Sequence, residues 1–114
     1  MWLQRAIEFT NSTGVGRYSS EALGVLSHVL LQLGKGAAAI RWARTALERA
    51  RSTGNKKSEA VALEALGRAL KKMGMNQDAR SVLETSCATY RELGLEPDAE
   101  RIAVLVAATK SKAG

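Results

Sequence analysis

The sequence repeats itself with a period of 40 residues. Shifted by 40 positions, the stretch 22–54 falls on the stretch 62–94, with leucine, glycine and alanine in the same order. The matching positions are Ala22, Leu23, Leu26, Leu30, Gly34, Ala39, Thr45, Arg51 and Gly54, which fall on Ala62, Leu63, Leu66, Leu70, Gly74, Ala79, Thr85, Arg91 and Gly94. The same shift places Trp2, Ala6, Glu8, Ser12, Thr13 and Gly14 on Trp42, Ala46, Glu48, Ser52, Thr53 and Gly54. Two runs in one register indicate that the chain is built from copies of one structural unit.

Each unit reads as two helices. Leu63, Leu66 and Leu70 follow the 3.6-residue period of a helix, and Gly74 ends it because glycine tolerates the backbone conformation of a helix exit. Small residues at Gly67 and Ala79 allow the two helices of a unit to approach closely. With one proline and few aromatic residues, the sequence predicts an all-α fold. The six expected helices are 2–12, 19–33, 37–53, 57–73, 77–93 and 97–109.

The second unit carries a recognisable signature. The pattern Leu63-x-x-Leu66-Gly67-x-x-Leu70-x-x-x-Gly74-x-x-x-x-Ala79-x-x-x-Leu83 resembles the tetratricopeptide repeat. The sequence departs from that family at Ser27 and Ser86, where small apolar residues are usual, and at Ala43, where a larger residue is common. Its unit of 40 residues is also longer than the usual one of about 34. The resemblance implies an α-solenoid of antiparallel helix hairpins with right-handed superhelical stacking. The longer unit is similar to repeats in bacterial signal-transduction and transcriptional regulators, and also to those of animal scaffold proteins.

The phase of the repeat predicts one domain over residues 1–109. It consists of a half-unit at 1–14, units at 19–54 and 59–94, a half-unit at 97–109, and a flexible tail at 110–114. The opening helix matches the second helix of a unit and the closing helix matches the first, so each lacks a partner. We therefore expect a fragment of a larger protein, or a small protein that self-associates end to end through exposed apolar residues. The expected contact residues are Trp2, Leu3, Ile7 and Phe9 at one end and Ile102, Leu105 and Val106 at the other.

In the resembled family, the first helices of the units line a concave groove that binds peptides or partner helices. The positions displaced from the core stripe are Glu21, Gly24, His28, Leu31, Gln32, Val61, Glu64, Arg68, Lys71, Lys72 and Arg101. Of these, we expect His28, Gln32, Glu64, Arg68, Lys71, Lys72 and Arg101 to contact the partner. Four cations would make one half of the groove basic, which favours an acidic peptide or another domain of the parent chain. The family's carboxylate clamp does not carry over, because His28 and Arg68 stand where asparagine is expected.

The net charge of +6 is concentrated between Lys35 and Lys57. This region has seven cations (Lys35, Arg41, Arg44, Arg49, Arg51, Lys56 and Lys57) against Glu48 alone, so the rest of the chain is neutral. Such a surface is either a solvated helix face or a nucleic-acid contact, and a nucleic-acid-binding helical repeat is the alternative function. The sequence contains no glycine-rich phosphate loop and no row of aromatic residues for base stacking.

Catalysis is the least supported function class. His28 and Cys87 are the only histidine and cysteine, and they occupy repeat positions that do not meet. No metal-ligand spacing such as Cys-x-x-Cys occurs, and we expect no cofactor. The apolar run Ile102–Ala108 is too short to span a bilayer. One cysteine and no signal peptide lead us to expect a cytoplasmic protein that contacts no membrane.

Overall fold

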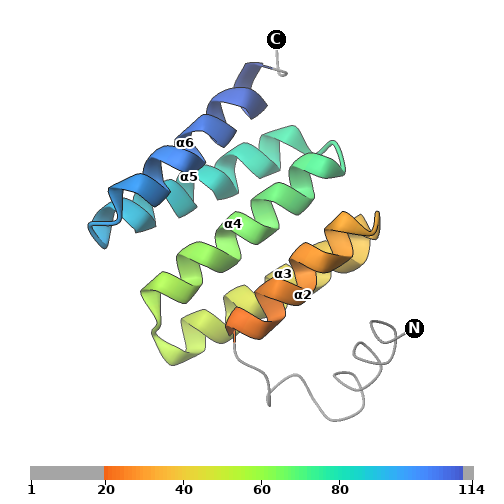
Figure 1. The fold of residues 1–114 in the computed structure, drawn as a ribbon, viewed down its shortest axis with the longest axis horizontal. Coiled ribbons are helices and arrows are strands. Elements are labelled where there is room, and N and C mark those ends of the chain that lie inside the picture. The colour runs from red at the N-terminus through yellow and green to blue at the C-terminus, as the bar shows by residue number, and fades with distance from the viewer. Residues whose placement is uncertain (1–19, 112–114) are drawn as a thin grey trace.

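The computed structural model describes residues 20–111, which form five α-helices and no strand (Figure 1). The helices are α2 (Ser20–Gln32), α3 (Gly36–Thr53), α4 (Lys56–Lys72), α5 (Asn76–Glu92) and α6 (Glu96–Ser111). The predicted all-α class is confirmed, and every observed boundary lies within two residues of its prediction. The largest difference is at α6, which includes the first two residues of the predicted tail at 110–114. The helix predicted at 2–12 lies outside the described residues.

Every connection between these helices has the same backbone geometry. Glycines occur at intervals of 20 residues, and each has a positive φ: 78° at Gly34, 71° at Gly54, 81° at Gly74 and 76° at Gly94. In each case the N–H of the residue after the glycine donates to a carbonyl five positions back, as from Lys35 to Leu30 over 2.9 Å. This glycine exit satisfies carbonyls that the helix end leaves free. The turn within a unit is therefore the same as the turn between units.

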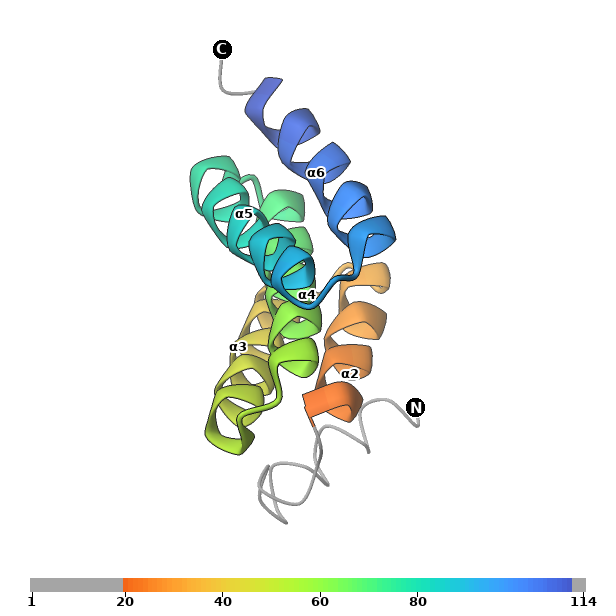
Figure 2. The same ribbon diagram turned by 90° about the vertical axis from the view of Figure 1, so that its left-hand side faces the viewer.

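The helices stack in chain order. Each packs against its neighbour in sequence, and α2 also contacts α4. Seen from the side, α3 and α5 lie on one side of the molecule and α2 and α6 on the other, with α4 between them (Figure 2). The result is a short solenoid of antiparallel hairpins, in which the first helices of the units, α2, α4 and α6, line one cavity. We call the side formed by α2, α4 and α6 the inner face.

The core depends on close approaches between small and large side chains. A Cβ atom added to Gly67 would lie 2.5 Å from Cδ2 of Leu83, so only glycine fits opposite this fully buried leucine. The expectation that Gly67 allows a close hairpin is confirmed. In the first unit the equivalent positions are Ser27 on α2 and Ala43 on α3, so the larger residue of the pair is on the other helix.

The two serines that depart from the family pattern form buried hydrogen bonds between helices. Ser27 Oγ donates to the carbonyl oxygen of Ala39 over 2.7 Å, and Ser86 Oγ donates to that of Ala60 over 2.8 Å. Both hydroxyls are buried, so the bonds remove the cost of burying a polar group. Each serine thus joins the two helices of its unit through a buried hydrogen bond.

One expectation about the last helix is wrong. Ile102 was predicted to face a missing neighbour, but it is fully buried in a cluster with Leu83, Tyr90 and Ala99. The reason is that α6 packs the face bearing Ala99 and Ile102 against α5. Val104, at 68% exposure, is the most exposed large apolar residue of the described chain.

Candidate functional site

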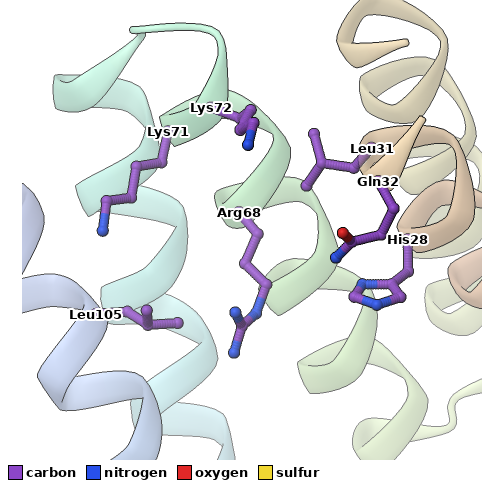
Figure 3. Close-up of a pocket in the computed structure, with 7 residues that line it drawn as sticks. All are labelled: His28, Leu31, Gln32, Arg68, Lys71, Lys72 and Leu105. Carbon is purple, nitrogen blue, oxygen red and sulfur yellow. The ribbon is translucent and has the colours of Figure 1, made fainter. Parts of the chain in front are cut away.

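The inner face carries a groove between α2, α4 and α6. A cavity of about 450 Å³ is lined by His28, Leu31 and Gln32 of α2, Arg68, Lys71 and Lys72 of α4, and Leu105 of α6. The side chains of His28 and Gln32 point from α2 toward α4, and Lys71 extends on the side of Leu105 (Figure 3). The structure therefore brings together the five predicted groove residues that lie on these parts of α2 and α4.

A second hollow of about 530 Å³ continues this cavity along α2 and α4. It shares His28 and Arg68 with the first, and the rest of its lining is Glu21, Gly24, Val25, Val61, Glu64 and Ala65. Most of these side chains are apolar or absent, and Val25 is 64% exposed. We call the two hollows together the inner groove. It has an apolar half near Val25 and a basic half near Lys71.

Sequence reasoning missed three residues of the inner groove. Val25 and Ala65 lie beside predicted groove positions, and an exposed valine on an otherwise amphipathic helix was an available signal. Leu105 was assigned to an end contact, yet it lines the groove opposite α2. The 40-residue register was an available signal here too, because it aligns Leu105 with Ala65 and Val25, which line the same groove.

Glu64 is the centre of a charged network at the groove wall. Its carboxylate accepts hydrogen bonds from Arg68 Nε over 3.0 Å, from Arg101 Nη1 over 2.5 Å and Nη2 over 3.1 Å, and from the Tyr90 hydroxyl over 3.2 Å. Arg101 also donates to Asp98 over 3.1 Å. The Glu64 side chain is only 14% exposed. The network therefore ties α4 to both α5 and α6.

The electrostatics of this network follow from partial burial of Glu64. Burial alone raises the pKa of the Glu64 carboxyl, but hydrogen bonds and charge from Arg101 and Arg68 outweigh it, so the net pKa is below its usual value. Burial, followed by the negative charge of Glu64, raises the pKa of Tyr90 to about 12. The hydrogen bond to Glu64 raises the pKa of Arg101. All three groups therefore keep their ordinary charge states near neutral pH.

The expectation that four cations make one half of the groove basic is corrected by the structure. Arg68 and Arg101 are neutralised by Glu64 and Asp98 rather than free to bind a ligand. Within residues 20–111, no carboxylate lies within ion-pair distance of the Lys71 or Lys72 amine. The available positive charge of the inner groove is therefore confined to the end of α4.

The predicted end-contact residues fall in different places. Ile102 is in the core, Leu105 lines the inner groove, and Val106 lines a separate groove between α5 and α6. Trp2, Leu3, Ile7 and Phe9 lie outside the described residues.

The basic region extends from Lys35, which precedes α3, along α3 to Lys56 and Lys57 at the start of α4. Arg51 and Lys56 both pair with Glu59, over 3.0 Å and 3.4 Å, and the hydrogen bond from Arg51 is the main reason that the pKa of Glu59 is lowered. The Arg41 guanidinium lies 5.9 Å from the centre of the Trp42 ring. Part of the charge is thus used within the fold, and nucleic-acid binding here stays an alternative prediction.

The described residues offer little for other chemistry. His28 lies in the inner groove, whereas Cys87 is buried on α5, where its thiol donates to the carbonyl oxygen of Ala99 over 3.3 Å. Between residues 20 and 111 there is no group of three histidine, cysteine, aspartate or glutamate side chains placed to hold a metal ion. None of the described helices combines the length and the apolar character needed to cross a bilayer.

A comparison with known families connects this geometry to a class of protein. The sequence profile described as tetratricopeptide repeat matches residues 18–92, which include α2, α3, α4 and α5. No curated protein and no solved structure matches the chain.

Proposed function

Because the chain belongs to the tetratricopeptide repeat family, whose members generally mediate protein–protein interactions, we propose that its inner groove binds an acidic segment of another protein. The segment is a peptide, a helix or part of a neighbouring domain of the parent chain. The observation that carries this proposal is the pair of lysine amines at the end of α4, which lie beside an open cavity without a carboxylate partner in the described chain.

The two halves of the inner groove specify the character of the ligand. Carboxylates of the ligand bind Lys71 and Lys72, because charge-assisted hydrogen bonds are stronger than neutral ones. An apolar side chain of the ligand covers Val25 and Val61, since burying an exposed valine removes apolar surface from water. Glu64 lines the apolar half, where Arg68 and Arg101 balance its charge, so the ligand's acidic residues cluster at the end that carries Lys71 and Lys72.

In this proposal the domain holds a partner and performs no chemistry of its own. Arg68 of the Glu64 network forms part of the groove wall, while His28 and Gln32 supply ring and amide groups for hydrogen bonds to the ligand backbone. The resemblance to bacterial regulators supports a scaffolding role in the cytoplasm, in which the domain relays a signal to a transcription-controlling protein.

The test is a binding titration with a labelled acidic peptide of glutamate and leucine. Replacing Lys71 and Lys72 with glutamine removes two charges from the groove, and the matched control replaces Lys35 and Lys57 with glutamine. Exposed ion pairs contribute up to about 1 kcal/mol each, so the first variant should lose about tenfold in affinity. The control should retain the affinity of the unsubstituted protein. Equal losses in both variants would show non-specific attraction by net charge and contradict the proposal.

A further inference from the structure

A second groove lies between α5 and α6, separate from the inner groove. It has a volume of about 340 Å³ and is lined by Glu84, Cys87, Ala88 and Arg91 of α5 and Ala103 and Val106 of α6. We call it the end groove. Its apolar floor consists of Cys87, Ala103 and Val106.

The internal repeat shows what covers such a groove. The positions 40 residues before Cys87, Ala103 and Val106 are Leu47, Leu63 and Leu66. These three leucines are 8%, 4% and 6% exposed, and they share a core cluster with Ala79 and Val82 of α5. The equivalent groove between α3 and α4 is therefore covered by α5, which is the second helix of its unit.

The chain contains one further sequence of that kind. Residues 2–14 match 42–54, and a second shift of 40 places Trp2, Leu3 and Ile7 in register with Val82, Leu83 and Cys87 of α5. Leu83 is fully buried against Gly67, and Ala107 takes the place of Gly67 on α6. A small, exposed residue is thus present on α6 where Leu3 would pack.

We infer that the occupant of the end groove is residues 2–12 of a second copy of this chain. That segment packs on α5 and α6 of the first copy and forms a hairpin with α6, so the two copies associate head to tail. Such an interface joins different surfaces of the two partners and does not close on itself, so association continues beyond the dimer. This inference does not depend on what the inner groove binds.

Glu100 weakens the proposed contact between α6 and the N-terminal segment of the second copy. Ala60 is fully buried beneath α5 and its carbonyl accepts the Ser86 hydroxyl, whereas the equivalent position on α6 is the exposed Glu100. Packing a helix there desolvates a carboxylate, which costs free energy. Glu100→Ala should therefore shift self-association to lower protein concentration.

Two blocked variants and their mixture test the arrangement. Ala103→Glu with Val106→Glu blocks the end groove, and Leu3→Asp with Ile7→Asp blocks the N-terminal segment. Sedimentation velocity up to millimolar concentration should show oligomers of the unsubstituted protein that grow with concentration, and monomers for each variant alone. An equimolar mixture should form dimers that grow no further, because each pair retains one intact contact. Val104→Glu, a change at the exposed position equivalent to Glu64, should leave self-association intact.

Circular dichroism of each variant establishes that its helices have formed before the masses are compared. A parent protein that stays monomeric throughout, or blocked variants that do not form dimers when mixed, would overturn the inference. Dimers of the variant blocked at the N-terminal segment alone would also overturn it, since they would show a symmetric contact through α6.

Discussion

The two complete units share their helix order and their glycine turns but have different inner surfaces. In the first unit Ser20 Oγ donates to the carbonyl oxygen of Ala46 over 2.8 Å, and in the second Ser86 Oγ donates to that of Ala60, also over 2.8 Å. Ser20 and Ala60 are equivalent positions, so the donor and acceptor helices have exchanged roles while the contact is kept. On the inner face no such match exists, because Gly24 stands where the second unit has Glu64.

This contrast separates what the fold needs from what the surface does. Two residues in contact between helices can exchange places, provided that the pair still fills the same volume and forms the same hydrogen bond. Inner-face residues are released from that constraint. The second unit carries an ionic network and two lysines without a carboxylate partner among residues 20–111, whereas the equivalent positions of the first unit are Gly24, His28, Leu31 and Gln32. The asymmetry of the inner groove therefore arises from the surface and not from the backbone.

The largest expected effect comes from adding a methyl group to a glycine in each unit. Nothing lies within 4 Å of a Cβ atom built on Gly24, whereas one on Gly67 meets Leu83 at 2.5 Å. Alanine improves helix propensity equally at both sites, so the difference between Gly24→Ala and Gly67→Ala isolates the packing cost, about 1–3 kcal/mol. Chemical denaturation measures both variants. With Leu83→Ala as background, Gly67→Ala should become stabilising, and a persistent loss there would contradict the close contact.

A smaller effect is expected at the exchanged serines. Ser20→Ala and Ser86→Ala each remove one buried hydrogen bond between helices and should lower the free energy of unfolding by about 0.5–1.5 kcal/mol. Combining Ser86→Ala with Ala60→Ser moves the hydroxyl to the helix that carries it in the first unit. That double variant should recover most of the loss in thermal unfolding. If it is less stable than Ser86→Ala, the two units are not interchangeable at this contact.

The smallest effect is a pH dependence that belongs to the second unit alone. The pKa of Glu64 in the folded chain is below its usual value of 4.5, so ionised Glu64 stabilises the fold above that pH. This stabilisation is lost as the pH falls through the lowered pKa, because the protonated carboxyl no longer pairs with Arg68 and Arg101. The difference in melting temperature between the unsubstituted protein and Glu64→Gln should therefore shrink as the pH becomes acidic. A constant gap between the two at all pH values would show that the charge of Glu64 has no role.

The fold was predictable because its signals are local and repeated. Leucines at helical spacing, Gly67, and glycines such as Gly74 specify helices, a close hairpin and its turn from neighbouring residues. The inner groove was predictable as a position, since the first helices of stacked hairpins share a face. Its charge was not, because Arg101 reaches Glu64 across 37 residues of sequence. The burial of Ile102 was indicated by the repeat, because the 40-residue shift places it on Ala62, which is buried in α4.

In the function proposed above, the inner groove binds an acidic partner through the end that carries Lys71 and Lys72. Titration of isotope-labelled protein with the acidic peptide, followed by amide chemical shifts in NMR, tests this most directly. We expect the largest shifts at His28, Gln32, Lys71 and Lys72, with α3 unchanged. Shifts centred on the region from Lys35 to Lys57 would contradict it and would favour the alternative of a non-specific anion or nucleic-acid surface.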